Sequence, residues 1–545
     1  MGKYHADLRE YIAMLEREGK LNRVTRAINK DTELMPIVRW QYKGLTESER
    51  KAWLFENVVD STGKKYDSSV AVALLGGSRE IYAMALNTTP DKIDEQWNKA
   101  LLNPIPPVIV ESGPVHEEVK YVENFNQENG GLYELPIPIS TPGFDCAPYL
   151  TSPYWVTKDP ETGITNIGTY RGMIKAADRT GIMTHQAQHI GIHLQKAKAM
   201  GMKTLPAAVV LGCVPVVGMC SVAKIPYGVD EYAVAGGLAG EPIPLVKCKT
   251  VDIEVPATSE IVLEGEIPVD ILEQEAPFGE YTGYMGPRAL NHFFNVKCIT
   301  NRRKAVYQAF ISQCPPSESS KIRQISYEAV MYKFLKYDCN IPSILKVAFH
   351  ESSGSWEYMV IQMKKTNPSQ PWQALNAAVA LDPTIGKFII AVDEDIDPLD
   401  PDSVNWALSF RVQPHLDCRI TTGKSSMLDP SSAPPGASTN EDRFPAPVGT
   451  SAILIDATRP FAFPAVSLPA KEYMEHAKNI WEELGLPKLT PKAPWHGYTL
   501  GYWSKENEEE ARLAVQGKHY LTGNKLASTR VQMQDLETKA LSDGK

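Results

Sequence analysis

The sequence of 545 residues lacks the features that mark several large classes of protein. Its eight cysteines are scattered and form no CxxC pair, which is unlike a disulfide scaffold or a thiolate metal site. No long run rich in Lys and Arg stands out and the formal net charge is −9, so we expect no nucleic-acid partner. The sequence also contains no internal repeat, no Walker A motif and no GxGxxG fingerprint.

Signals for export and membrane insertion are missing too. Acidic and basic side chains are spread through the first twenty residues, unlike a signal or transit peptide. The longest apolar run, Leu205–Ala223, is interrupted by Pro206, Gly212, Pro215 and Gly218. We expect this run to form two buried strands joined by a turn, and we expect a cytoplasmic protein with reduced thiols and no membrane association.

The composition is that of a large globular protein, with 43% hydrophobic and 22% charged residues. The length predicts two to four domains, and residues 1–107 read as an N-terminal α/β segment. Leu8, Ile12 and Leu15 share one helix face, and Gly19 can end that helix. We therefore expect a helix over residues 4–19, a strand at Leu21–Val24, a helix around Lys92–Leu102 and a boundary at the Pro-rich stretch 103–107.

Residues 108–320 change to short β-branched runs between Pro and Gly turns, which is typical of a barrel or a sandwich. A helical segment, Thr184–Ala199, interrupts them and places His185, His189 and His193 on one face. The ends of this set lie about 12 Å apart along a helix, so we expect only one His to point into a site. The expected strands are Pro107–Val110, Ile164–Arg171, Ala207–Leu211, Val251–Val255, Glu260–Gly265, His292–Ile299 and Val306–Ile311.

Residues 321–465 alternate between helical and strand-like segments, which predicts an α/β domain. A helical tail follows over residues 466–545, and we expect its Trp481, Trp495 and Trp503 to pack on the core or on a neighbouring subunit. The last 25 or so residues are polar, and we expect them to be disordered. The expected helices are Ser326–Tyr337, Trp356–Lys365, Pro371–Ala380, 470–485 and 505–516; the expected strands are Ile344–His350, Lys387–Asp393 and 451–456; the expected loops are Asp393–Asp402, solvated, and 424–447.

The stretch Gln274–Glu280 carries two carboxylates, Glu275 and Glu280, on a shaped loop. Pro277 fixes φ, and Gly279 tolerates backbone angles that other residues avoid. Carboxylates held in this way can transfer protons if burial and neighbours tune their pKa values. Taken alone, however, a Glu pair in a loop is most often solvated.

Further polar clusters stand among apolar strand-like segments: Asn166 to Arg171, Gln188-His189 and Asp230-Glu231. An Arg at the end of a strand can clamp a carboxylate or a phosphate. Asn, His and Glu together supply oxygen and nitrogen ligands that suit Mg²⁺ or Mn²⁺ better than structural zinc. The Gly-rich stretch Gly236–Gly240 is a turn with only a weak phosphate-binding signal.

In these stretches the sequence resembles the UbiD family of decarboxylases, which use prenylated FMN, and the resemblance covers about residues 5–480. The helix with Leu8-Arg9-Glu10 and Leu15-Glu16 also resembles the start of the family. The resemblance implies a β-rich split-barrel flavin domain, an α/β oligomerisation domain and a C-terminal helical tail, hence an α+β or α/β fold. The matching stretches, in family order, are Asn166 to Arg171, Gln188 to Ile190, Gly228 to Glu231, Val255 to Gly265 and Glu275 to Glu280.

The resemblance implies roles for individual residues. Asn166, His189 and Glu231 would hold a divalent metal, usually Mn²⁺ or else Mg²⁺, that binds the cofactor phosphate. A K⁺ ion would be shared by Glu231 and backbone carbonyls. The carbonyls concerned are those around Cys220, Ser221 and Ala223, and the residues lining the flavin are Gly168, Thr169, Tyr170, Arg171 and Gln188, with Lys387 as a loosely matched cation on the cofactor side.

The catalytic trio that the resemblance implies is Arg171, Glu275 and Glu280. Arg171 would keep Glu275 ionised, Glu280 would carry the proton to the carbon that lost CO₂, and the flavin would supply the electron sink. Tyr281 would face the substrate. A redox flavoprotein on a similar barrel and a non-catalytic subunit of a carboxylase complex are the alternatives, and retention of the whole trio argues against both.

The expected reaction is a reversible, non-oxidative decarboxylation of an aromatic or α,β-unsaturated carboxylate. A hydroxybenzoate-like acid and an aromatic acyl-CoA such as phthaloyl-CoA rank close together as substrates, because the chain past residue 424 exceeds what a minimal family member needs. Arg323, Lys424 and Arg443 could meet an acidic substrate, although scattered cations are usually solvated. The family also implies a homo-oligomer, dimer or hexamer, and a flavin prenyltransferase as cofactor supplier.

Overall fold

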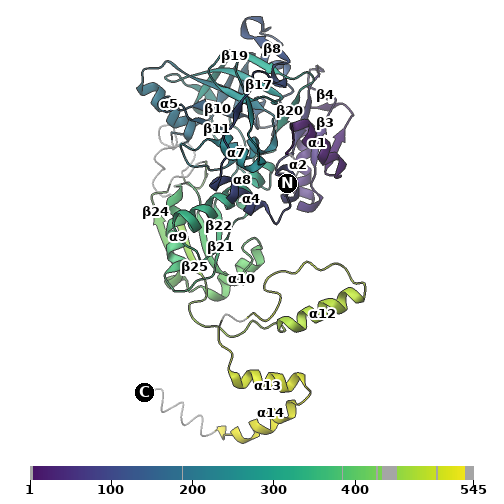
Figure 1. Cartoon of the computed structure of the whole chain (residues 1–545), viewed down its shortest axis with the longest axis vertical. Coiled ribbons are helices and arrows are strands. Elements are labelled where there is room, and N and C mark those ends of the chain that lie inside the picture. Colours follow the sequence, from purple (N-terminus) through teal and green to yellow (C-terminus); the bar gives the residue numbers. More distant parts are fainter. Residues whose placement is uncertain are drawn as a thin grey trace. The chain divides into compact units, whose positions relative to one another are not determined.

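The computed structural model describes residues 4–186, 188–382, 384–424, 428–432, 451–498 and 501–533. The chain forms two compact units (Figure 1). Unit 1 comprises Met1–Val392 and Gln413–Asp456, and unit 2 comprises Asp393–Val412 and Ala457–Lys545. No helix within the described ranges is long and apolar enough to cross a membrane.

A ten-stranded sheet, antiparallel between neighbours, is the centre of unit 1. The long strand β19 (Ala289–Asn301) pairs with β17, β13, β18 and β8, so it joins the parts of the sheet that carry the site. The other strands are β8 (Glu118–Tyr121), β9 (Tyr149–Leu150), β10 (Tyr154–Lys158), β11 (Thr165–Thr169), β12 (Gly172–Ala176), β13 (Arg179–Ile182), β14 (Thr204–Leu211), β17 (Ile261–Pro268) and β18 (Glu273–Glu275). This curled sheet with many helices confirms the mixed α+β prediction (Figure 1).

Both faces of this sheet are buried. Along β14, Ala208 and Val210 belong to one hydrophobic cluster, whereas Val209 and Leu211 belong to another. Side chains alternate between the faces of a strand, so a strand buried on both sides appears in the sequence as a continuous apolar run. Each of the seven strands expected between residues 107 and 311 overlaps a strand of the structure.

The prediction of two strands for Leu205–Ala223 is half wrong. The first half is β14, but the second half is the helix α6 (Pro215–Val222). Pro215 occupies the first turn, where its missing N–H is no loss. Gly218 lets the helix approach the sheet, because a Cβ there would lie 2.4 Å from the Tyr154 hydroxyl oxygen. Packing has therefore overridden the strand preference of the valines.

Two further helices cover β11, and both differ from expectation. Helix α5 begins at His189 (His189–Ala199), so His185 lies before the helix instead of on its face. Helix α7 (Glu231–Ala239) contains Gly236 and Gly237, so the predicted Gly-rich turn is wrong. A Cβ on Gly236 would lie 2.3 Å from the Ile105 carbonyl oxygen, so the glycine permits close packing of the helix on another segment.

The N-terminal part of unit 1 agrees with the predictions. Helix α1 (Leu8–Arg17) buries Leu8, Ile12 and Leu15, and Gly19 follows it with φ of +67°. The other helices here are α2 (Leu34–Gly44), α3 (Arg79–Ala85) and α4 (Ile93–Leu102). The small sheets contain β1 (Leu21–Val24), β3 (Ala52–Phe55), β6 (Ser69–Val72) and β20 (Val306–Ala309); β2 (Ile28–Asn29), β4 (Val58–Val59) and β5 (Lys65–Tyr66); β7 (Val108–Ile109), β15 (Pro244–Lys247) and β16 (Glu254–Pro256).

A five-stranded sheet forms the last part of unit 1. The helix predicted at Trp356–Lys365 is wrong, because this segment contains the interior strand β22, whose alternate residues Met359, Ile361 and Met363 lie in one core cluster. The predicted strand at 451–456 is confirmed as β25 (Ser451–Ala457). The remaining elements are β21 (Ile344–Phe349), β22 (Tyr358–Met363), β23 (Phe388–Asp393), β24 (Cys418–Thr422), α8 (Glu318–Lys333), α9 (Gln370–Leu381) and α11 (Pro414–Asp417).

Unit 2 corrects the expectation of a solvated acidic loop. Asp393 and Asp395 are buried and pair with Arg411, at 2.9 and 2.7 Å. The predicted tail helices are confirmed as α12 (Lys471–Glu483) and α13 (Lys505–Val515), and α14 (His519–Leu526) extends into the segment expected to be disordered. Unit 2 also contains α10 (Pro401–Arg411). Most of the predicted linker 424–447, and the chain end from residue 534, lie outside the described residues.

Candidate active site

Arg171 joins two glutamates that are distant from it in the sequence. Its Nε donates to Glu275 Oε1 at 2.6 Å, and its Nη1 pairs with Glu280 Oε1. All three side chains are nearly shielded from solvent, with exposed fractions of 9%, 0% and 11% for Arg171, Glu275 and Glu280. The structure therefore brings the predicted trio together as one buried cluster of two acids and one base.

The elements around this cluster explain its placement. Arg171 lies between β11 and β12, and Glu275 ends β18, which pairs with β19. Asn291, on β19, donates to the second oxygen of Glu275 at 3.1 Å. Both oxygens of Glu275 therefore have a donor, which fixes the orientation of the carboxylate.

A tight reversal of the chain carries Glu280. The Glu280 N–H donates to the Tyr284 carbonyl at 2.8 Å, and the Gly286 N–H donates to the Phe278 carbonyl at 2.8 Å. The Phe278 ring lies under the Arg171 guanidinium, 5.5 Å from its centre, and contacts the Tyr149 ring. Backbone bonds and aromatic contacts thus hold the loop that carries Glu280, which we call the catalytic loop, residues 278–286.

Gly279 is required for a different reason from the one expected. It does not have the positive φ that favours glycine, so backbone freedom does not explain it. A Cβ there would lie 2.4 Å from Cγ and 3.0 Å from Cβ of Gln313. The absence of a side chain lets the catalytic loop pack directly on Gln313.

We expect Gly279→Ala to destabilise the protein by about 1–3 kcal/mol, because the new methyl group overlaps atoms near the Gln313 backbone. Urea unfolding measures the change. Gly44→Ala is the matched control, because its Cβ would find only a Trp40 ring atom at 3.9 Å. Equal stability of the two variants would contradict the packing explanation.

Asn166, His189 and Glu231 form a second cluster beside β11. His189 Nδ1 lies 2.8 Å from Asn166 Oδ1 and 3.7 Å from Glu231 Oε1. The Ile167 N–H donates to Glu231 Oε2 at 3.0 Å, and burial raises the pKa of the Glu231 carboxyl. The structure thus brings together the three predicted ligands of a divalent metal.

The residues of this cluster fit a divalent cation. Asn166 Nδ2 is buried without a hydrogen bond of good geometry among the described residues. Because an amide can be turned by 180° without changing its shape, this position can present an oxygen to an ion. Amide oxygen, imidazole and carboxylate are ligands that Mn²⁺ and Mg²⁺ accept. Only two of the three are His, Cys, Asp or Glu, and the described residues contain no group of three or more of these that could hold a metal.

The predicted monovalent site falls at the end of helix α6. Cys220 and Ser221 belong to its last turn and Ala223 is its C-cap. The Ser221 hydroxyl lies 2.8 Å from the Thr169 hydroxyl, so this helix end meets β11 near the Asn166 cluster. Carbonyl oxygens at a helix C-terminus carry partial negative charge, which suits a cation.

The predicted flavin-lining residues lie at the end of β11, directly after it, or at the N-cap of α5. Thr169 and Gly168 end β11, and the Gln188 side chain accepts from the His185 N–H at 2.8 Å. The Tyr170 ring lies so close to Gly168 that a Cβ there would be 2.4 Å from the hydroxyl. His193 is in the core instead, bonded to Thr157, and burial lowers the pKa of its imidazole to about 4. Of the three histidines, the structure therefore places His189 in a predicted ligand cluster and His193 in the core.

Two predicted residues are not in the Arg171 cluster. The Tyr281 ring packs on Trp356 at 5.4 Å, and its hydroxyl donates to Glu357 at 3.2 Å, so it faces the five-stranded part of unit 1. The Lys387 ammonium pairs with Asp429 at 2.5 Å. Lys387 also acts electrostatically on Glu357, which accepts the hydrogen bond from Tyr281 of the catalytic loop.

The partly buried carboxyl of Glu357, next to Tyr281, makes the stability of the fold depend on pH. Burial, with the Asp429 carboxylate nearby, raises the pKa of Glu357 to about 7, against the lowering influence of Tyr281, Lys387 and Lys424. A raised carboxyl pKa stabilises the fold fully below the ordinary value of about 4.3, and this contribution is lost as the pH rises through 7. We expect Glu357→Gln to remove that loss, so that Tm falls less than in wild type between about pH 5 and pH 8. The exposed Glu128→Gln is the control, and equal pH slopes would contradict the assignment.

The structure also shows site residues that sequence reasoning missed. Asn291 supports Glu275, and the Tyr149 hydroxyl donates to the Ala276 carbonyl at 2.7 Å. Burial raises the pKa of Asp145 to about 6, with Arg171 opposing the shift. No spacing in the sequence connects these residues with Glu275, because strand pairing and a loop 130 residues away bring them together.

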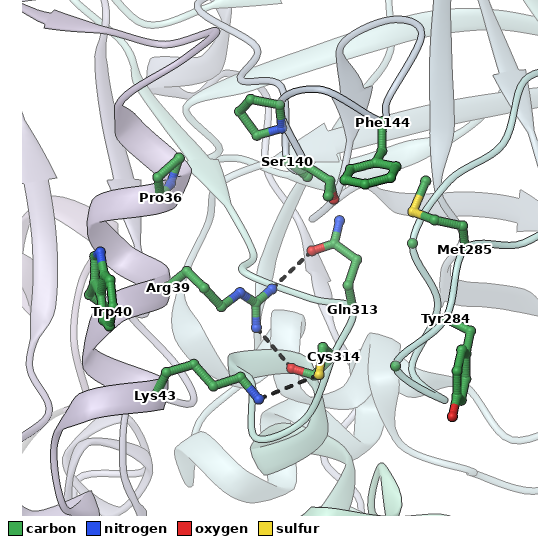
Figure 2. A pocket seen from close by; sticks show the side chains of 14 residues that line it. Pro36, Arg39, Trp40, Lys43, Ser140, Phe144, Tyr284, Met285, Gln313 and Cys314 are labelled. Carbon is green, nitrogen blue, oxygen red and sulfur yellow. Dashed lines mark hydrogen bonds between the residues drawn. The ribbon is translucent and has the colours of Figure 1, made fainter.

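Arg323 and Lys424 do not act as free cations at a pocket mouth. Arg323 stacks on the Tyr281 and Trp356 rings, and the Lys424 ammonium donates to the Ile385 carbonyl at 2.5 Å. Arg443 lies outside the described residues. Arg39 and Lys43 instead line a cavity of about 580 Å³ beside the catalytic loop (Figure 2).

Three domains of one known family match this chain, in the order in which they occur along it. The sequence matches the N-terminal domain of the 3-octaprenyl-4-hydroxybenzoate carboxy-lyase family over residues 12–101, its Rift-related domain over 108–315 and its C-terminal domain over 321–457. The fold, the buried Arg–Glu pair and these matches define a carboxy-lyase. The chain belongs to the UbiD family.

The relatives described next align with this chain over nearly their whole length. It is 30% identical to a phenolic acid decarboxylase of Bacillus subtilis, over 84% of this chain and 93% of the relative. The UbiD-class enzyme HmfF of Pelotomaculum thermopropionicum, solved with prenylated FMN in an evolved dimeric form, shares 30% identity and a TM-score of 0.73, covering 87% and 99% of the two chains. Vanillic acid decarboxylase of Sedimentibacter hydroxybenzoicus shares 27% identity and a TM-score of 0.74, covering 88% and 100%.

Proposed function

We propose that this carboxy-lyase removes CO₂ reversibly and without oxidation from an aromatic or α,β-unsaturated carboxylate, and that it uses prenylated FMN. One observation carries the proposal: a single buried arginine, Arg171, hydrogen-bonds Glu275 and forms an ion pair with Glu280. Hydride transfer does not need such a trio, whereas loss of CO₂ needs a proton to replace it.

The residues divide the work as follows. Arg171 and Asn291 each donate a hydrogen bond to Glu275 and so hold its carboxylate in a fixed orientation toward the reacting group. Glu280, on the catalytic loop, delivers the proton to the carbon that loses CO₂. Prenylated FMN supplies the electron sink when bound.

Asn166, His189 and Glu231 would hold Mn²⁺ or Mg²⁺ against the cofactor phosphate, and the end of α6 would hold K⁺. The support is the short His189–Asn166 distance and the buried Glu231 carboxylate, together with a donor set of amide, imidazole and carboxylate that suits these ions. Gly168, Thr169, Tyr170 and Gln188 would line the flavin. Their role rests on their position beside the proposed metal ligands.

A hydroxybenzoate-like acid and an aromatic acyl-CoA such as phthaloyl-CoA remain the proposed substrates. We also propose the division at residues 107, 320 and 465, a cytoplasmic homo-oligomer, and a flavin prenyltransferase as supplier of the cofactor. The relatives named above, which act on phenolic and vanillic acids by their names, support an aromatic acid.

The test uses protein produced together with a flavin prenyltransferase. Absorbance and mass spectrometry identify the bound flavin, and a panel of aromatic acids and CoA esters is scored for CO₂. We expect prenylated FMN and CO₂ release from at least one aromatic acid or ester. A cofactor-loaded protein that releases no CO₂ from the panel would count against the proposed function.

A further inference from the structure

The cavity beside the catalytic loop has walls from four parts of unit 1. Helix α2 supplies Arg39, Trp40 and Lys43, and the segment 312–314 supplies Gln313 and Cys314. The opposite wall comes from residues 140–144 and 279–285 (Figure 2). At about 580 Å³ the cavity is within the usual range for a small-molecule site.

The charge of this cavity has one sign. Its described lining contains two cations, Arg39 and Lys43, and no acidic side chain. Arg39 donates to the Cys314 carbonyl at 2.9 Å and to Gln313 Oε1 at 3.0 Å, and Lys43 donates to the Pro315 carbonyl at 2.9 Å. These acceptors are neutral, so the positive charges attract an anion.

The other lining groups are flat and apolar. Phe144 and Met285 face the two cations across the cavity in Figure 2, and Trp40 and Tyr284 lie at its edges. Phe144, Trp40 and Tyr284 are all more than 60% exposed, so large aromatic surfaces around this cavity are open to solvent. Rings of this kind stack on planar ligands.

The cavity shares two walls with the catalytic cluster. Gly279 and Tyr284 lie on the loop that holds Glu280, and the Tyr284 carbonyl accepts the Glu280 N–H. The segment with Ser140 and Phe144 is followed directly by Asp145. The nearby charge of Arg171 opposes the rise in the pKa of Asp145 that burial causes. Gln313 touches both Arg39 and the Gly279 position. A ligand that extends past the catalytic loop would therefore reach the two cations.

We propose that this cavity binds the outer part of the substrate, and that Arg39 and Lys43 select aromatic acids that carry a second anionic group, a carboxylate or a phosphate. The inference rests on the proposed function, because it takes the carboxylate that is lost to lie at Arg171 and Glu280. The second anion then pairs with Lys43 at the cavity edge, and the ring system packs on Phe144 and Met285.

Binding by calorimetry tests the proposal without requiring turnover. The probes are benzoate, the three benzenedicarboxylates and coenzyme A, each titrated into cofactor-loaded full-length protein. We expect a dicarboxylate or coenzyme A to bind at least tenfold more tightly than benzoate. Tight dicarboxylate binding identifies a carboxylate as the second anion, and coenzyme A binding identifies a phosphate. Binding of benzoate as tight as that of every dianionic probe would overturn the proposal.

Variants then locate the interaction. Lys43→Gln, at an exposed position, should lower the affinity for the dianionic probe about tenfold and leave the affinity for benzoate unchanged. Lys43→Arg should restore the affinity for the dianionic probe. Lys99→Gln on α4 is the matched control. The binding result for Arg39→Gln is interpreted only if the variant keeps the wild-type Tm, because Arg39 also hydrogen-bonds α2 to segment 312–314.

Failure of the inference differs from failure of the proposed function. If the protein releases CO₂ but Lys43→Gln changes KM for mono- and dianionic acids equally, the cavity proposal is wrong and the decarboxylase stands. If no CO₂ is released while the probes bind as expected, the cavity proposal survives as a ligand site and the reaction is wrong.

Discussion

Glu280→Gln is expected to lower the rate of CO₂ release by about 100- to 10,000-fold while the protein keeps its fold and its flavin. Gln has the shape of Glu but cannot give or take the proton that replaces CO₂. Its amide can still occupy the catalytic loop, because the loop is held by the backbone bonds of residues 278–286 and by Phe278. Single-turnover CO₂ release with flavin absorbance in the same sample measures both effects.

The matched control is Glu273→Gln. Glu273 lies on the same strand as Glu275 but pairs with Lys175 at 2.9 Å, outside the buried cluster. We expect this variant to keep wild-type turnover. Unchanged CO₂ release in Glu280→Gln, or an equal loss in both variants, would remove Glu280 from the mechanism.

Arg171→Met is expected to have the largest effect on stability. It leaves the fully buried Glu275 and its neighbour Glu280 without their cation. Breaking a buried ion pair by removing one partner costs about 3–5 kcal/mol. CO₂ release should be abolished.

Urea unfolding measures this change, with Arg171→Lys as the control. Lys keeps the charge, so most of the stability should return, but it lacks the planar fork that reaches both glutamates. Activity should therefore stay low in both variants. Equal destabilisation by Arg171→Met and Arg171→Lys would contradict the charge argument.

Local structure followed well from sequence where one rule decided it. The helix with Leu8, Ile12 and Leu15 is present as predicted, because these residues bury one face of it in a single core cluster, and the strand at Leu21–Val24 has the predicted bounds. Four strands of the central sheet, β11, β14, β17 and β19, were also predicted, because runs of β-branched residues between turn residues favour strands.

Prediction failed where packing decided between alternatives. Val216 and Val217 favour a strand, but Pro215 and the contact of Gly218 with Tyr154 make a helix. In the acidic stretch after β23, Asp393 and Asp395 are buried because Arg411, on the following helix, folds back on them. Neither outcome depends on local propensity, so no local pattern signals it.

In the candidate site, too, some residues were predicted and others were not. The pairing of Arg171 with Glu275 spans 104 residues and was predicted only through resemblance to the family. Asn291, Asp145 and the cavity cations Arg39 and Lys43 stand in stretches without a motif, so no sequence pattern marks them as site residues. Strand pairing with β19 and the approach of α2 to the catalytic loop bring them to the site.

Turnover in D₂O tests the central claim most directly. A non-oxidative decarboxylase should release one CO₂ and place one solvent deuterium on the carbon that lost it, without consuming NADH or NADPH. In Glu280→Gln both the CO₂ and the deuterium should decline together. Reduction of the bound flavin by a nicotinamide, with no CO₂ released and no deuterium in the aromatic product, would contradict the account.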